Sequence, residues 1–150
     1  MQHAFYGAEL SKKIHAQNKI YPGIDSPSDL YDALSKIWCE YSCAPRMRSN
    51  WNEENITLGQ CSITAFLAQD IFGGKVFGVL RPDGNFHCYN LVEGVVFDLT
   101  SEQFQGEALD YSLRHEQSRA IHFSKQEKKE RYEYLKAELG KKFQGEFKLC

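Results

Sequence analysis

Residues 59–74 read GQCSITAFLAQDIFGG. Apolar side chains cover most of the circumference that this segment would have as a helix: Ile63, Ala65, Phe66, Leu67, Ala68, Ile71 and Phe72. A helix that is apolar nearly all round is normally central and buried. The glycines at 73 and 74 predict its C-terminal end, so the sequence predicts a buried helix over residues 60–72.

Cys61 falls in the first turn of this predicted helix, directly after Gly59 and Gln60. The backbone N–H groups of a first helical turn have no partner within the helix, and the helix dipole is positive there. Both effects favour a thiolate. Cys61 is therefore a candidate nucleophile; the alternative is a small buried cysteine that only packs.

Three antiparallel strands are predicted next, over residues 75–80, 86–92 and 95–99. Residues 81–85, RPDGN, have turn chemistry, and a glycine at 94 marks a tight return. With that return centred between residues 92 and 93, His87 lies opposite Asp98 on one face of the sheet, within hydrogen-bonding reach. A shift of one residue in either strand would separate them.

A long helix is predicted over residues 27–44. Ser26 can cap it, Pro27 fits its first turn, and Asp29 is favoured by the helix dipole. Apolar side chains then recur at helical spacing: Leu30, Leu34, Ile37, Trp38 and Tyr41. This helix would flank the central one.

Two capping-box patterns predict further helix starts. In the first, the Thr100 side chain would accept from the backbone N–H of Gln103, and the Gln103 side chain would accept from the backbone N–H of Thr100. In the second, Ser124 and Glu127 open a final helix that ends near Leu139.

The remaining segments carry weaker signals. Residues 8–14 predict a short helix, residues 46–58 an irregular polar loop, and residues 110–123 give no assignment. We see no repeat or linker that divides the chain. Residues 1–150 are therefore predicted to form one α+β domain, with a cysteine-bearing helix on an antiparallel sheet and flanking helices.

The composition excludes several classes of protein. Hydrophobic residues make up 42% and charged residues 25%, which is typical of a globular chain and not of a disordered one. The net charge of −2 provides no basic excess for nucleic acid. We found no apolar run of about 20 residues that would span a membrane and no signal-peptide pattern near the N-terminus. We expect a soluble cytoplasmic protein; its oligomeric state is left open.

The chain has five cysteines: Cys39, Cys43, Cys61, Cys88 and Cys150. An odd number without a repeating framework fits reduced cytosolic thiols better than a disulfide scaffold. Cys39 and Cys43 would share a helix face, but we see no zinc motif around them, so we interpret both as small buried hydrophobes. Cys88 should face away from His87 and is predicted to be in the core. The other histidines are scattered and form no ligand motif: His3, His15, His115 and His122. We expect no metal and no cofactor.

Several sparse residues in this order resemble the pattern of the YunG-like family, small and functionally uncharacterised proteins that are mostly bacterial: Trp51, Asn55, Gly59-Gln60-Cys61, Gln69-Asp70, Phe72-Gly73-Gly74, His87, Asn90, Asp98-Leu99-Thr100 and Gln103-Phe104. The resemblance implies a small papain-like or transglutaminase-like domain with a Cys61–His87–Asp98 arrangement. Cys88 and Tyr89 depart from the family, in which an aromatic pair more usually follows the histidine. The resemblance implies no established reaction.

In such a triad, His87 would accept the proton of the Cys61 thiol and Asp98 would orient the imidazole. The backbone N–H of Cys61 is one candidate donor for an oxyanion, and the side chains of Gln60 and Asn55 are two more. Trp51 could line a substrate groove or simply pack. Structural alternatives remain open, since His87 could be an ordinary half-buried strand residue and Asp98 could cap the helix that follows.

Three functions fit these residues. The first is an acyl-transfer enzyme that hydrolyses an amide or isopeptide bond, deamidates glutamine or transfers the acyl group to an amine. Its partner would be a peptide, a protein side chain or a small amide. The second is a non-catalytic module that binds a peptide or small molecule in the same groove. The third is a redox-sensing thiol, which would not need Asp98.

Overall fold

The computed structural model describes residues 3–148, with side chains up to residue 143. Along these residues the elements are η1 (Leu10–Lys13), α1 (Pro27–Leu34), η2 (Pro45–Asn50), α2 (Cys61–Phe72), β1 (Lys75–Leu80), β2 (Phe86–Val92), β3 (Val95–Phe97), η3 (Ser101–Phe104), β4 (His115–Glu116), α3 (Arg119–Phe123) and α4 (Gln126–Lys148), where η marks a 3-10 helix. Cys150 lies outside the described residues.

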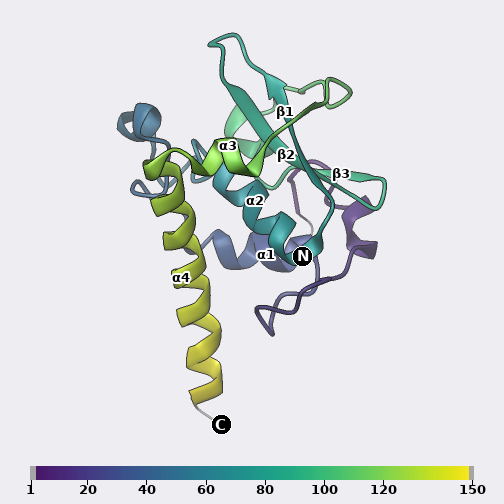
Figure 1. Cartoon of the computed structure of the whole chain (residues 1–150), viewed down its shortest axis with the longest axis vertical. Coiled ribbons are helices and arrows are strands. Elements are labelled where there is room, and N and C mark those ends of the chain that lie inside the picture. The colour runs from purple at the N-terminus through teal and green to yellow at the C-terminus, as the bar shows by residue number, and fades with distance from the viewer. Residues whose placement is uncertain (1–2, 149–150) are drawn as a thin grey trace.

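The described strands form one antiparallel sheet in the order β3-β2-β1-β4. Helix α2 packs on one face of it and lies between the sheet and the long helix α4 (Figure 1). The class is therefore α+β, as predicted. That residues 1–150 form one domain stays a prediction.

The two faces of β2 serve different purposes. Cys88 and Val92 belong to the main core, which α2 shares, while the Asn90 side-chain amide donates to the carbonyl of Ala65 at 2.8 Å. Tyr89 points the other way, into a second apolar cluster with Val79 and Tyr111. The prediction that Cys88 is a core residue is confirmed, since it is buried.

The hairpin from β2 to β3 turns one residue later than predicted. Val92 pairs with Val95, so Glu93 and Gly94 form the turn, both with positive φ. This is the geometry of a tight two-residue hairpin. Moving the centre by one residue shifts the register by two. His87 and Asp98 are therefore not directly opposite, but they stay on the same face as diagonal neighbours.

Helix α1 ends much earlier than the predicted helix. Its capping box is present as predicted, with Ser26 and Asp29 bonded to each other's backbone N–H. The helix stops at Leu34, and turns follow. Near Cys39 the hydroxyl of Ser42 accepts from the Cys39 N–H and donates to the Cys39 carbonyl.

Other boundaries also differ from the predictions. The segment predicted as an irregular loop contains η2, and the predicted final helix, α4, continues to Lys148. Strand β3 ends at Phe97, two residues early. Thr100 starts only the short η3 and does not cap it, because its hydroxyl donates to Asp98 instead.

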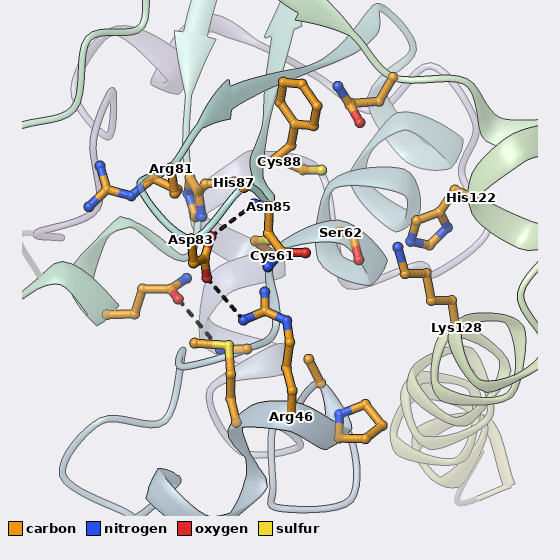
Figure 2. A pocket seen from close by; sticks show the side chains of 18 of the residues that line it. Arg46, Cys61, Ser62, Arg81, Asp83, Asn85, His87, Cys88, His122 and Lys128 are labelled. Carbon is orange, nitrogen blue, oxygen red and sulfur yellow. Dashed lines mark hydrogen bonds and ion pairs between the residues drawn. The ribbon is translucent and has the colours of Figure 1, made fainter.

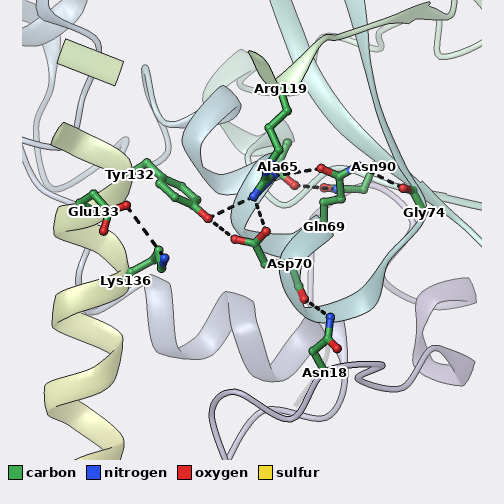
Figure 3. A network of polar contacts seen from close by, with 10 residues as sticks. All are labelled: Asn18, Ala65, Gln69, Asp70, Gly74, Asn90, Arg119, Tyr132, Glu133 and Lys136. Atoms are coloured by element: carbon green, nitrogen blue, oxygen red, sulfur yellow. Dashed lines mark hydrogen bonds and ion pairs between the residues drawn. The ribbon is translucent and has the colours of Figure 1, made fainter. Parts of the chain in front are cut away.

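A polar network anchors α3 and α4 to α2 (Figure 3). The guanidinium of Arg119 donates to Gln69 at 3.1 Å, to Asp70, and to the Tyr132 hydroxyl at 3.1 Å. Tyr132 in turn donates to Asp70. This network fixes α3 and the first turns of α4 against α2. His122, which belongs to the site described below, lies on α3, between Arg119 and Tyr132 in the sequence.

None of the helices in residues 3–148 has the length and apolar character needed to cross a membrane.

The N-terminal segment is held against the end of β3. The N–H of Asp98 donates to the carbonyl of Tyr6 at 2.9 Å, and the N–H of Tyr6 donates to the Ser101 hydroxyl oxygen at 2.8 Å. Gly7 has φ +82°, and a Cβ there would lie 2.2 Å from the carbonyl oxygen of Val96. Only glycine fits this approach.

Replacing Gly7 with alanine should therefore destabilise the fold by about 2–4 kcal/mol, because strain at positive φ adds to the clash with backbone. Gly84→Ala is the matched control: Gly84 also has positive φ, but a Cβ there meets nothing within 4 Å. Its expected cost is about 1 kcal/mol. Urea unfolding of both variants measures the difference, and equal losses would contradict the close approach at Gly7.

Candidate functional site

A pocket of about 800 Å³ opens at the N-terminus of α2 (Figure 2). Its wall includes Cys61, His87 and Cys88. The loop between β1 and β2 and the start of η2 form one side, and α3 with the beginning of α4 forms another. The described structure thus brings the predicted thiol and imidazole to one cavity.

Asp98 and His87 form a buried pair. The Nε2 atom of His87 lies 2.6 Å from a carboxylate oxygen of Asp98, and the two side chains are 3% and 1% exposed. The same carboxylate accepts hydrogen bonds from the Tyr111 hydroxyl at 2.7 Å and from the N–H and hydroxyl of Thr100. Asp98 therefore both binds the His87 ring and accepts a hydrogen bond from the backbone N–H of Thr100 in the following turn. These are the two roles that the sequence left open.

Cys61 begins α2 and is partly exposed. Its pKa lies well below the ordinary value of a thiol. Hydrogen bonding with the Cys88 thiol is the largest cause, burial opposes it, and the positive charge of His87 lowers the pKa further. The unpaired N–H groups of the first helical turn act in the same direction.

His87 responds in the opposite sense. Burial lowers its pKa, but the charges of Asp98 and Cys61 outweigh burial and raise the pKa to about 10. At neutral pH the two shifts together favour a thiolate on Cys61 and an imidazolium on His87. Because Nε2 is bonded to Asp98, Nδ1 is the ring nitrogen left to exchange a proton with the thiol.

Cys88 contributes a second thiol to the site. Although its side chain belongs to the core face of β2, its pKa is raised by hydrogen bonding with Cys61 and by burial, so it stays protonated. A protonated thiol can donate its hydrogen to a neighbouring thiolate. The sequence placed Cys88 in the core but gave no signal of this contact.

The other candidate residues lie away from the pocket wall. Gln60 is fully buried, and its amide donates to the Cys39 carbonyl at 3.1 Å. The Asn55 amide donates to the Gln103 carbonyl at 3.4 Å, and the Trp51 indole donates to the Ile56 carbonyl at 3.0 Å. Their donors are thus used by the backbone, which leaves the backbone N–H of Cys61 as the predicted oxyanion donor at the pocket.

Two residues of the site were not predicted from the sequence. Tyr111 binds Asp98 from the segment without an assignment, and burial, with the Asp98 charge, raises its pKa. His122 lines the pocket at 8% exposure. Neither residue belongs to a motif, so only tertiary contact reveals them.

The side chains described, up to residue 143, contain no group of three or more histidine, cysteine, aspartate and glutamate residues that could hold a metal ion.

Comparison with known proteins identifies the family. The family model described as YunG protein matches residues 26–144, which is most of the chain and includes Cys61, His87 and Asp98. The chain belongs to the YunG family. The predicted family resemblance is therefore confirmed.

One relative is the protein described as "Uncharacterized protein YunG" from Bacillus subtilis (strain 168). It is 46% identical over 72 residues, which cover 48% of this chain and 57% of the relative. The matched region thus spans little more than half of the relative's length. No solved structure matches the chain.

Replacing Cys88 tests its effect on Cys61. Cys88→Ala should raise the pKa of the Cys61 thiol by about one unit or more, because a hydrogen-bond donor to the thiolate is lost. Cys88→Ser keeps a donor and should preserve most of the lowered pKa. The pH dependence of Cys61 alkylation, located by peptide mass spectrometry, gives both values.

Cys43→Ala is the control for this series, because the Cys43 thiol is also buried but donates to the Ala44 carbonyl at 3.5 Å. An unchanged Cys61 profile in Cys88→Ala would show that Cys88 does not stabilise the thiolate.

Proposed function

We propose that this chain is a thiol-dependent acyl-transfer enzyme in which Cys61, His87 and Asp98 form a papain-like or transglutaminase-like triad. One observation carries the proposal: His87 is held by Asp98 at 2.6 Å on one side and meets the Cys61 thiol on the other, at the wall of an open pocket. This is the order of groups that activates a nucleophile and fixes its base.

In the proposed reaction the Cys61 thiolate attacks the carbonyl carbon of an amide. The carbonyl π electrons move to the oxygen, and the N–H of Cys61 at the start of α2 stabilises the oxyanion. When the oxyanion collapses, the C–N bond breaks and His87 gives its proton to the leaving amine. A thioester between Cys61 and the acyl group remains.

The second half of the reaction regenerates the enzyme. Neutral His87 takes a proton from water or an incoming amine, which attacks the thioester carbonyl. The C–S bond breaks, Cys61 leaves as a thiolate, and His87 again carries a proton. Water gives hydrolysis or deamidation, which differ in the amide that is cleaved, and an amine gives transamidation. The substrate is expected to be a peptide, a protein side chain or a small amide.

Asp98 is a positioning residue in this scheme. It accepts from Nε2 and so keeps Nδ1 directed to sulfur, and its negative charge stabilises the imidazolium. The alternative function, a non-catalytic binding module, would use the same pocket but would not require an activated Cys61.

The first test is alkylation of Cys61 by iodoacetamide as a function of pH, with the other thiols as internal references. The rate should be high and level from neutral pH upward and should fall only at acid pH, below the lowered pKa of Cys61. In His87→Ala the rate at pH 7 should fall by up to about 30-fold, the loss for a thiol that returns to a pKa near 8.5 and is about 3% ionised, because the positive charge of His87 is removed while the hydrogen bond from Cys88 remains. Asp98→Asn should give a smaller loss.

His15→Ala is a matched control, since His15 also binds an aspartate but on the exposed surface. Intact-mass analysis after treatment with 4-nitrophenyl acetate then separates the alternatives. An acetyl group on Cys61 that depends on His87 supports acyl transfer. A Cys61 that reacts like the other thiols regardless of His87 would overturn the enzyme proposal and leave the binding module.

The contact between Cys61 and Cys88 favours a redox sensor as a second candidate. Hydrogen peroxide would oxidise the Cys61 thiolate to a sulfenic acid and release hydroxide. Cys88 sulfur would then attack Cys61 sulfur, with loss of water, and form a disulfide.

Peroxide treatment should then remove two hydrogen atoms from the peptide pair that contains Cys61 and Cys88. The loss should persist in Asp98→Asn and disappear in Cys88→Ser, where Cys61 oxidation continues to the sulfinic acid. A Cys61–Cys88 disulfide that does not form at peroxide concentrations sufficient to oxidise Cys61 would contradict this role.

A further inference from the structure

One end of the pocket contains a buried histidine without a hydrogen-bond partner. His122 is 8% exposed, and among the described residues neither of its ring nitrogens is bonded. An imidazole buried in this way loses its hydrogen bonds to water and gains none from protein, which costs free energy. Because His122 lines the pocket, the group that satisfies it can come from the pocket.

The surroundings of His122 are positively charged. Burial and the charges of Lys128, Arg131, Arg119 and Lys125 lower its pKa to about 3, so the ring is neutral at pH 7. A neutral imidazole has one N–H donor and one acceptor nitrogen. It can therefore donate to an anion without carrying charge itself.

The charges at this end are not balanced. Arg131 is paired with Glu127 at 2.8 Å and also donates to the Ser42 carbonyl. Lys125 and Lys128 line the pocket, and neither forms an ion pair with any residue from 3 to 143. Because the charges of Glu127 and Arg131 cancel, the positive charges of Lys125 and Lys128 remain at this end.

The cations on the other side of the pocket are neutralised. Arg46 pairs with Asp83 at 3.3 Å, and Arg81 makes a double hydrogen bond to Glu107 at 2.9 and 3.0 Å. The pocket is therefore polarised, with its excess positive charge at the end formed by α3 and α4. Figure 2 shows His122 and Lys128 together at this end, with Ser62 between them and Cys61.

This end is close to the reactive sulfur. Ser62 follows Cys61 and also lines the pocket. The charge of Lys128 acts on both Cys88 and His122, so it lies within electrostatic range of the thiol pair and of the imidazole. A group bound at Lys128 would therefore share the pocket with a carbonyl carbon at Cys61.

We propose that His122, Lys125 and Lys128, with Ser62, form a subsite for an anionic group of the acyl substrate, a carboxylate or a phosphate. The lysines supply the charge, and His122 and Ser62 supply N–H and O–H donors. The inference rests on the proposed acyl transfer at Cys61 and specifies its substrate class: an amide whose acyl part ends in an acid.

The test compares two alkylating agents of similar size, iodoacetate and iodoacetamide, at Cys61. The ratio of the iodoacetate rate constant to the iodoacetamide rate constant should fall on the order of tenfold in Lys128→Gln. The positive charge of Lys128 attracts the anionic iodoacetate into the pocket and does not attract the neutral iodoacetamide. Lys129→Gln is the matched control, since Lys129 is exposed on the same helix and outside the pocket wall. A ratio that is equal in the two variants would overturn the subsite.

A second measurement does not depend on the reactivity of Cys61. In Cys61→Ser, the imidazole NMR signals of His122 should shift saturably with glutarate or with inorganic phosphate, and this shift should be lost in the Lys128→Gln background. A response to glutarate alone identifies a carboxylate site, and a response to phosphate alone identifies a phosphate site. No saturable response to either overturns the subsite.

The two experiments separate failure of the subsite from failure of the enzyme proposal. Rapid alkylation by iodoacetamide without any dependence on Lys128 would overturn the subsite and leave acyl transfer standing. An inert Cys61 with saturable glutarate or phosphate binding would overturn acyl transfer and support an anion-binding pocket.

Discussion

The burial of one carboxylate, that of Asp98, is the constraint on which the rest of the site depends. An ionised carboxylate removed from water costs several kcal/mol unless hydrogen-bond donors replace the water. Here the donors come from β2, from the turn after β3 and from the Tyr111 segment, while Tyr6 binds the Asp98 backbone. Segments far apart in the sequence are thereby held at one point, and removing any of these donors would leave the charge less well compensated.

The same carboxylate determines the charges of the groups beyond it. Asp98 stabilises the imidazolium of His87, which in turn stabilises the thiolate of Cys61, so negative, positive and negative charges alternate from the interior to the pocket. In a site of low dielectric these interactions are stronger than they would be in water. Cys88 extends the series without adding charge, because a protonated thiol stabilises a thiolate as a donor. The activation of Cys61 is thus a property of the whole series of groups.

The sequence was sufficient where the signal was local. The apolar run of α2, the glycines after it and the turn residues at 81–85 predicted α2, β1 and β2 to within one residue. The β2–β3 turn was misplaced by one residue, yet His87 and Asp98 were still predicted on one face, because side chains repeat every two residues along a strand. The roles of Tyr111 and His122 depend on contacts across the fold, and no periodicity in residues 110–123 indicates them. Helix α1 also ends earlier than its apolar spacing indicates: Lys36 and Ile37 donate to carbonyls three residues back, so turns follow Leu34.

The two ends of the pocket are linked through α2. Cys61 lies at its first residue, and Gln69 and Asp70 near its last turn anchor Arg119 of α3 and Tyr132 of α4. A buried 12-residue helix is rigid, so the anchors fix how far α3 and α4 stand from the sulfur. His122 and Lys128 lie on the elements held in this way. If an anionic group binds there, this fixed separation would select acyl groups by length, because a shorter chain would not bring its carbonyl carbon to Cys61 while its acid remained bound.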